Sequence, residues 1–261
     1  MLISLASASG SPGVSTTALG LALVWPRDVI LVEADTVGAS ATLAGFFAGS
    51  LPPRSTILDI TPGADFEEQL MARSVALTDN QSPIRRLVPG ISNPLHGPQL
   101  STRWDALALA LSDLERAGID VLVDIGRIHS PHLAGPILQT SDITALVLRP
   151  TITATLTART TIKNRHLAEE AGLSSPALHL VTISAPDTYS AGETSKALHQ
   201  PVLGTLPWAP KHASVFAHGK PRPRGFDTSS YARSLRSLSG AISSAGPKRR
   251  DAIQTLRGVT R

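Results

Sequence analysis

The chain has 261 residues, a formal net charge of +4, 42% hydrophobic residues and no cysteine. This length and composition are typical of one sizeable α/β domain, and the lack of cysteine excludes disulfides, thiol chemistry and Cys-based metal sites. No apolar run approaches the ~20 residues that a membrane-spanning helix requires, and no basic leader of a signal peptide precedes the first one. We therefore expect a cytoplasmic protein with no integral membrane segment.

Short apolar runs alternate along the chain with longer segments of helical periodicity. Several runs are almost continuously hydrophobic, as expected when both faces of a parallel sheet are buried. The expected strands are 2–8, 29–34, 120–125, 143–149, 177–183 and 202–206, and the expected helices are 15–24, 98–117, 132–139, 152–171, 189–198 and 227–244. This alternation predicts an α/β fold with a mostly parallel twisted sheet and helices on both faces, in three layers.

Two parts of the chain are less regular. Residues 50–97 are rich in Pro, Gly and Ser, and we expect two short strands (56–60 and 84–89) around a short helix (65–72). The last residues, PKRRDAIQTLRGVTR, are basic and are expected to be disordered or to form a short amphipathic helix. The predicted organisation is thus a domain over 1–244 followed by a basic tail over 245–261.

A turn between the first expected strand and the first expected helix has the parts of a phosphate-binding loop. Residues 9–17 read SGSPGVSTT, and backbone N–H groups at such a helix start bind anions without any side-chain charge. The full pattern GxxxxGK[ST] would need Gly, Gly, Lys and Ser or Thr where this chain has Ala8, Gly13, Val14 and Ser15. The hydroxyl that would bind magnesium is present, and the lysine is absent.

Two acidic residues end later strands. Asp35 closes the run VILVEAD, and Asp124 closes the run VLVD. Ligands of open parallel sheets bind beyond the carboxyl ends of the strands, so Asp35 could orient an attacking water and Asp124 could bind magnesium beside Ser15. The alternative is that both are turn or helix-cap residues.

With these residues, the chain resembles the ParA/MinD group of P-loop ATPases, which have a deviant Walker A loop. That group's loop reads KGGxGK[ST]T, its second strand ends in DxD, its third ends in an acid, and a proline follows a late strand beside the base. The resemblance covers most of residues 1–240 and implies ATP and Mg²⁺ as cofactors. It implies nucleotide contacts at Gly10, Ser11, Pro12, Gly13, Val14, Ser15, Thr16 and Pro207, magnesium ligands at Ser15 and Asp124, and a DxD at Glu33 and Asp35, with Asp35 catalytic if the protein is active.

Both lysines of that loop are replaced in this chain. Ser9 stands at the signature lysine, which in the group reaches the partner's phosphates across a dimer, and Val14 stands at the Walker lysine. One such charged contact contributes ~1.5–3 kcal/mol. The loop most resembles the CpaE/TadZ branch, which helps to position pilus or secretion machinery, although that branch often keeps the signature lysine. We expect weak nucleotide binding with little or no hydrolysis, with Arg127 as a candidate replacement cation.

The positive charge is concentrated at the end of the chain. Residues 208–261 hold eleven Lys or Arg and two acids, a net charge of +9, whereas residues 1–207 carry −5. Such a segment is either a solvated face or a contact surface for an acidic partner. Two aromatic residues near late strand ends, Tyr189 and Trp208, are candidates to flank a base, and the histidines show no metal-ligand spacing.

Three functions therefore remain open from the sequence. The first is a dimeric, ParA/MinD-like pseudo-ATPase that positions or modulates a secretion or pilus-assembly ATPase. The second is an active partition-type ATPase that binds nonspecific DNA through residues 208–261. The third is a nucleotide-free protein-interaction scaffold that has inherited the fold. Membrane attachment through the tail is not favoured, because the tail lacks a bulky apolar face.

Overall fold

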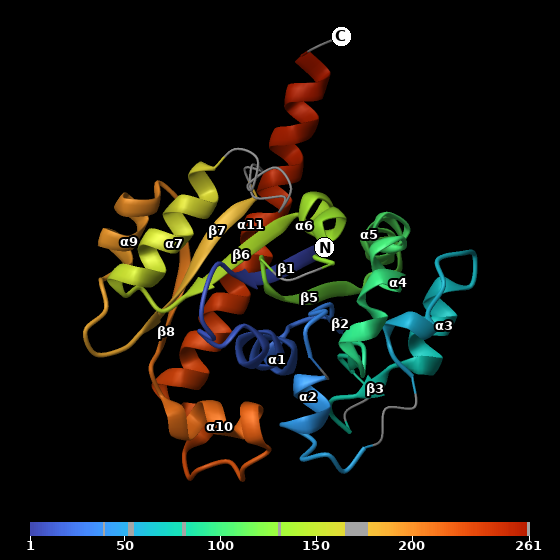
Figure 1. Cartoon of the computed structure of the whole chain (residues 1–261), viewed down its shortest axis with the longest axis horizontal. Coiled ribbons are helices and arrows are strands. Elements are labelled where there is room, and N and C mark those ends of the chain that lie inside the picture. The colour runs from blue at the N-terminus through green and yellow to red at the C-terminus, as the bar shows by residue number, and fades with distance from the viewer. Residues whose placement is uncertain (39, 52–54, 80–81, 130–131, 165–176, 260–261) are drawn as a thin grey trace.

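The computed structural model describes residues 1–259 except 39, 52–54, 80–81, 130–131 and 165–176, and it describes side chains up to residue 246. One sheet lies between two layers of helices (Figure 1). Its eight strands have the order β3-β4-β2-β5-β1-β6-β7-β8. Their bounds are β1 Leu2–Ser7, β2 Val29–Glu33, β3 Val75–Ala76, β4 Arg85–Val88, β5 Asp120–Arg127, β6 Ile143–Leu148, β7 Leu178–Ser184 and β8 Val202–Pro207.

Every neighbouring pair of strands is parallel except β3 and β4, which are antiparallel. Parallel neighbours need crossover connections, and helices supply them on both faces of the sheet. One layer contains α1 Val14–Val24, α2 Ala41–Ala44, α10 Pro210–His218 and α11 Ser230–Val259. The other contains α3 Phe66–Arg73, α4 Gly97–Ser101, α5 Trp104–Asp113, α6 Gly135–Thr140, α7 Ile152–Lys163 and α9 Ala191–Leu198. The predicted three-layer α/β fold is confirmed.

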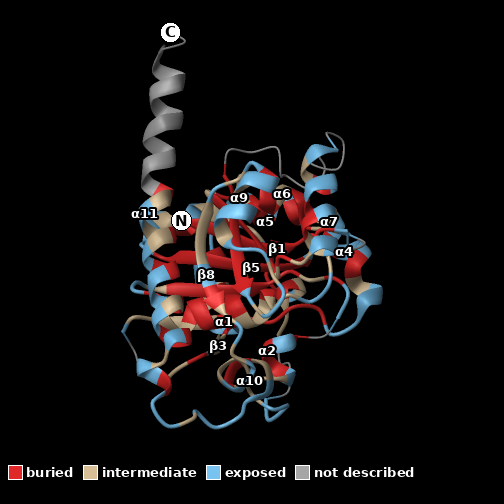
Figure 2. Cartoon of the chain, turned by 90° about the vertical axis from the view of Figure 1, so that its left-hand side faces the viewer, coloured by how far each residue is buried: buried red, intermediate tan, exposed pale blue. Residues whose placement is uncertain are grey.

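The central strand β1 shows why its sequence is continuously apolar. Successive side chains of a strand point to opposite faces of the sheet. Leu2 and Ala6 pack into the core beneath α5 and α6, whereas Ile3 and Leu5 pack into the core beneath α1 and α11. Figure 2 shows the buried residues concentrated in the strands and on the inner sides of the helices.

The irregular region departs from the prediction at several points. Residues 56–60 do not form a strand, because Thr56 and Asp59 make a capping box that starts the 3-10 helix η1, Ile57–Asp59. The short helix and the second strand of this region are found as α3 and β4. A two-residue strand, β3, was not predicted.

Helix ends also differ from the prediction. The single helix predicted over 98–117 is divided into α4, α5 and the 3-10 helix η3, Leu114–Ala117. At the break, Arg103 donates hydrogen bonds to the carbonyl oxygens of Leu58, at 2.7 Å, and Ile60, which joins this turn to η1. Of the helix predicted over 152–171, α7 ends at Lys163, and residues 165–171 lie outside the described part of the chain. Helix α10 was not predicted.

Helix α11 extends well beyond the helix predicted over 227–244. Its buried residues Tyr231, Leu235, Leu238 and Ile242 belong to the core shared with α1 and β8. The helix continues to Val259, so the predicted boundary at 244/245 falls within it, and the division into domain and tail stays a prediction. No helix in the described ranges is both long and apolar enough to cross a lipid bilayer.

A buried carboxylate joins the start of β5 to the end of α1. Asp120 is 2% exposed, accepts a hydrogen bond from Trp25 Nε1 at 2.8 Å, and forms an ion pair with Arg27 at 2.8 Å. Because Trp25 is itself fully buried, no water can replace this acceptor without opening the core.

We therefore expect Asp120→Ala to lower the free energy of unfolding by about 1–3 kcal/mol, since the buried indole N–H loses its acceptor. Urea denaturation followed by circular dichroism measures this change. Asp113→Ala is the control, because the Asp113 side chain is 64% exposed and its loss should change stability by no more than about 0.5 kcal/mol. Equal losses in the two variants would contradict a structural role for Asp120.

Candidate phosphate-binding site

The loop after β1 presents the start of α1 at the carboxyl edge of the sheet. Gly13 is the N-cap of α1, with φ 103° and ψ 38°, a left-handed conformation that favours glycine. No side chain caps this helix, and the first hydrogen bond within it runs from the Thr17 N–H to the Gly13 carbonyl at 2.9 Å. The preceding N–H groups, those of Val14 to Thr16, are therefore left for an anion.

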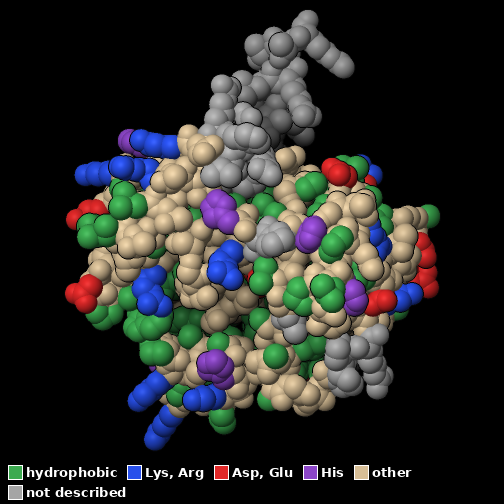
Figure 3. Space-filling model, in the orientation of Figure 1, with side chains coloured by type: hydrophobic (Ala, Val, Ile, Leu, Met, Phe, Trp, Pro, Cys, Tyr) green, Lys and Arg blue, Asp and Glu red, His purple; other side chains and the backbone are tan. Residues whose placement is uncertain are grey.

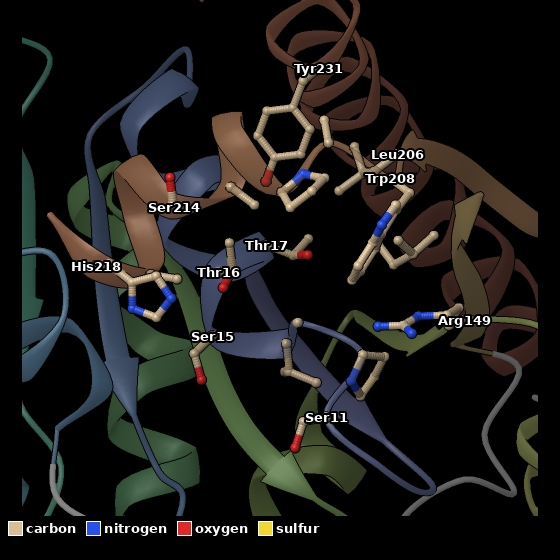
Figure 4. A pocket seen from close by; sticks show the side chains of 18 of the residues that line it. Ser11, Ser15, Thr16, Thr17, Arg149, Leu206, Trp208, Ser214, His218 and Tyr231 are labelled. Carbon is tan, nitrogen blue, oxygen red and sulfur yellow. The ribbon is translucent and has the colours of Figure 1, made fainter. Parts of the chain in front are cut away.

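A cavity of about 1100 Å³ opens over this helix start (Figure 4). Small-molecule pockets usually measure about 300–1,000 Å³, so the space accommodates a nucleotide. The structure brings nearly all of the predicted site residues to its walls: Gly10, Ser11, Pro12, Gly13, Val14, Ser15, Thr16, Asp35 and Pro207. Asp124 lies beneath the loop.

The sequence predicted Asp124 at the end of its strand, whereas the structure places it inside β5. The ladder between β1 and β5 pairs Leu5 with Asp124 and Ala6 with Gly126, so Ile125 has no partner and the strand continues to Arg127. Asp124 is buried, and its carboxylate accepts hydrogen bonds from the Ser15 hydroxyl and from the Gly126 N–H, the latter at 3.0 Å. The two predicted magnesium ligands are therefore adjacent.

The pKa of Asp124 is raised to about 7, mainly by burial and to a smaller extent by the carboxylates of Glu33 and Asp35, against the lowering effect of the hydrogen bonds from Ser15 and Gly126. A cation here would favour the ionised form, and hydroxyl and carboxylate oxygens are ligands that Mg²⁺ accepts. The described residues contain no cluster of three or more His, Cys, Asp or Glu suited to a metal. The donor set therefore fits a magnesium ion that takes its other ligands from water and phosphate.

The two acids of the predicted DxD have different surroundings. Glu33 is 4% exposed and accepts backbone hydrogen bonds from Thr42, at 2.9 Å, and Gly90, at 3.2 Å, so it joins the start of α2 to the loop after β4. Asp35 is partly exposed and lines the cavity. A Cβ added to Gly126, which has φ +70°, would lie 2.2 Å from Asp35 Oδ2, so only glycine fits beneath this carboxylate. A catalytic role for Asp35 stays a prediction.

The cavity also contains cations that the sequence analysis did not single out. The candidate Arg127 lines the cavity with Arg149, Lys211 and Lys220. Arg149 is half-buried, and the other three are exposed. Arg149 directly follows β6, much as Asp35 lies two residues after β2, and a search for basic as well as acidic residues at strand ends would have found it. The structure joins it to Trp208, whose ring centroid is 4.1 Å from the guanidinium carbon.

The other aromatic and histidine candidates are divided between the cavity and the rest of the molecule. Trp208 and His218 line the cavity, whereas Tyr189 lines a smaller groove with Ile152 and Leu156. His212 stacks on Phe226 at 5.7 Å between ring centroids. Two further histidines form hydrogen bonds outside the cavity: His129 with Thr161, and His132 with Ser101.

Solved structures with the same arrangement of strands and helices decide the fold. MinD from Aquifex aeolicus superposes with a TM-score of 0.67 at 15% identity, covering 93% of this chain and 96% of that chain. The chain has the fold of the MinD and ParA P-loop ATPases. A ParA family ATPase from Chlorobium tepidum gives a TM-score of 0.67 at 16% identity, covering 91% of this chain and 97% of that one.

A third solved structure, also a MinD, contains a nucleotide. The septum site-determining protein MinD from Pyrococcus horikoshii, complexed with Mg-ADP, gives a TM-score of 0.65 at 18% identity, covering 95% of this chain and 97% of that one. No family model and no curated protein sequence matches this chain. The resemblance to MinD and ParA proteins is thus confirmed for the fold, and the activity has to be argued from the residues.

The raised pKa of Asp124 predicts a pH-dependent stability. The unfolded chain releases this proton near pH 3.8 and the folded protein near pH 7, so the contribution of Asp124 to the free energy of unfolding falls as pH rises through this window. Asp124→Asn cannot ionise. We expect the stability of this variant, relative to the unchanged protein, to increase from pH 5 to pH 8 in urea denaturation with EDTA.

Asp113→Asn, at an exposed position, provides the comparison and should show no such trend. The free energies of unfolding of Asp124→Asn and of the unchanged protein could instead differ by a constant amount from pH 5 to pH 8. That result would mean that Asp124 ionises in its ordinary range.

Proposed function

We propose that the chain is a ParA/MinD-like nucleotide-binding regulator, a pseudo-ATPase that binds ATP with Mg²⁺ and hydrolyses it weakly or not at all. The observation that carries the proposal is the Ser15 hydroxyl bonded to Asp124 beneath a phosphate-type loop in which Val14 occupies the lysine position. The part of the site that binds through backbone and magnesium is retained. The lysine that stabilises charge during phosphoryl transfer is missing.

The residues of the chain would divide the work as follows. The N–H groups at the start of α1 bind phosphate oxygens, and Ser15 and Asp124 hold the magnesium ion. When bound, the ion neutralises part of the phosphate charge. Val14 is only 6% exposed and apolar, so it fills space beside the loop without contributing charge. Asp35 faces the cavity, where it would orient water if any hydrolysis occurs.

The proposed assembly is a homodimer formed through the loop face. Each copy is proposed to consist of a domain over 1–244 and a basic tail over 245–261. Gly10 and Ser11 are exposed at the tip of the loop, which leaves this face accessible to a second copy. By its resemblance to the CpaE/TadZ branch, the partner of this dimer would be a secretion or pilus-assembly ATPase.

Binding of a fluorescent ATP analogue with Mg²⁺, with phosphate release followed in the same samples, tests the proposal. We expect binding without appreciable release, and loss of binding in Ser15→Ala and Asp124→Ala. Val14→Lys should tighten binding about tenfold to a hundredfold, because it adds one charged phosphate contact. Ser237→Ala, at an exposed position on α11, is the control for Ser15→Ala. Rapid Mg²⁺-dependent release would overturn the pseudo-ATPase, and no binding would leave the scaffold function.

A second function, binding of nonspecific DNA, is supported by the surface of α10 and the start of α11. Lys and Arg side chains project over α10 in Figure 3. Between residues 208 and 246 all the basic side chains are exposed: Lys211, Lys220, Arg222, Arg224, Arg233 and Arg236. Asp227 is the one acid in that segment, and it pairs with Arg222 at 3.4 Å.

If this surface binds DNA, affinity for random duplex DNA should fall steeply between 50 and 200 mM salt in fluorescence anisotropy. The double variant Arg222→Gln, Arg224→Gln should reduce the slope of log K against log salt by about 2, since each phosphate contact contributes about 0.9. Arg73→Gln, an exposed arginine on α3, should leave the slope unchanged. Absence of binding at 50 mM salt would exclude this function.

A further inference from the structure

Arg149 reaches the same edge of the sheet as the phosphate loop, although it is far from the loop in sequence. Strands β1 and β6 pair in parallel with Ala6 opposite Leu146. Ser9 lies three residues after Ala6, and Arg149 lies three residues after Leu146. Arg149 lines the cavity, and in Figure 4 its guanidinium points from the side of β6 toward the loop that carries Ser11. A positive charge thus lies in the cavity wall on the same edge of the sheet as the phosphate loop.

The guanidinium of Arg149 is held in place by an aromatic ring. Trp208 follows β8, and the centroid of its ring is 4.1 Å from the Arg149 guanidinium carbon. The N–H groups of a guanidinium lie in its own plane, so they can still donate hydrogen bonds when the guanidinium stacks on an indole ring. Trp208 is 45% exposed, so it is not part of the packed core, and its ring is in contact with this cation at the cavity wall.

No acid of the described chain neutralises Arg149. Its Nε is buried without a hydrogen-bond partner among the described residues, and none of their ion pairs involves it. The walls of the cavity carry three further cations, Arg127, Lys211 and Lys220, and Asp35 is the only acid among the described residues that line it. An anion is therefore the ligand that this charge distribution favours.

Arg149 differs from the other three cations in how far it is ordered. Arg127, Lys211 and Lys220 are exposed, so each would lose side-chain freedom on binding an anion, whereas Arg149 is half-buried against Trp208 before any ligand arrives. A preorganised donor loses less entropy on binding. Arginine also contacts two phosphate oxygens at once through its planar fork of donors.

We infer that Arg149 supplies the positive charge that the loop lacks at Ser9 and Val14, and that it binds the phosphate groups of a nucleotide held at the start of α1. Trp208 is the positioning residue that orients the guanidinium. The inference rests on the proposed nucleotide binding, and it assigns the phosphate contact to a residue of β6's carboxyl end in place of a residue of the loop.

Calorimetric titration with Mg-ATP and with Mg-pyrophosphate tests the role of Arg149. Both ligands should bind at least about tenfold more weakly to Arg149→Gln, since one charged contact is lost, and Arg149→Lys should recover part of the affinity. Arg73→Gln, an exposed arginine on α3 outside the cavity lining, is the control. Arg127→Gln tests the competing cation, because Arg127 lines the same cavity from β5 and is exposed. Its affinities should change less than about threefold, as expected for a solvent-screened charge. Thermal unfolding of each variant checks that the fold is intact.

Two combinations separate a charge contact from a structural effect. Val14→Lys added to Arg149→Gln should restore binding of both ligands, because it returns a positive charge to the loop at another position. Trp208→Leu should weaken binding in the unchanged protein and have little effect when Arg149→Gln is already present, because its role is to orient Arg149. Equal effects of Trp208→Leu in the two backgrounds would show that it does not act through Arg149.

The possible outcomes distinguish this inference from the proposed function. If the unchanged protein binds Mg-ATP and Arg149→Gln binds it equally well, or if Arg127→Gln loses affinity in its place, the inference is wrong and the proposed function stands. If Mg-pyrophosphate binds through Arg149 but Mg-ATP does not bind, the phosphate contact of Arg149 stands, whereas its assignment to a nucleotide and the proposed function are wrong. If neither ligand binds to the unchanged protein, both are wrong.

Discussion

The parallel pairing of β1 with β5 on one side and β6 on the other is the constraint on which the site depends. Because β1 is completely buried at the centre of the sheet, its register against both neighbours is determined by hydrophobic side chains on two faces. That register brings Asp124 beneath the loop and Arg149 beside it. A slip of one residue on either side would turn these groups away from the cavity and toward a core.

The site that results has opposite charges at different depths. Glu33 and Asp124 are buried, and the carboxylates of Glu33 and Asp35 raise the pKa of Asp124, whereas the cations line the open cavity together with Asp35. A metal bound to phosphate satisfies both layers, since the cation meets the carboxylates and the phosphate meets the basic walls. Replacing the loop lysine by Val14 therefore removes one charge from a site whose remaining electrostatics still fit a nucleotide with magnesium.

Local patterns predicted most of the elements, and the errors came where a tertiary contact competes with a local preference. Residues 56–60 look like a strand by composition, but Thr56 and Asp59 cap a 3-10 helix at a position where the chain must turn. The break before α5 depends on Arg103 reaching the carbonyl groups of Leu58 and Ile60, and no periodicity in the helix itself encodes that contact. Asp124 ends an apolar run, yet the Gly126 bulge lets β5 continue past it.

The sequence by itself determined the three-layer fold, the positions of the main strands along the chain, the anion-binding helix start and the loss of the loop lysine, because hydrophobic periodicity and the glycine turn are local signals. Only the tertiary structure decided which distant residues share the cavity. The bond between Ser15 and Asp124 and the stack of Arg149 on Trp208 join segments that lie apart in sequence. Their proximity follows from strand order and register, which depend on how the whole sheet packs and which no single segment specifies.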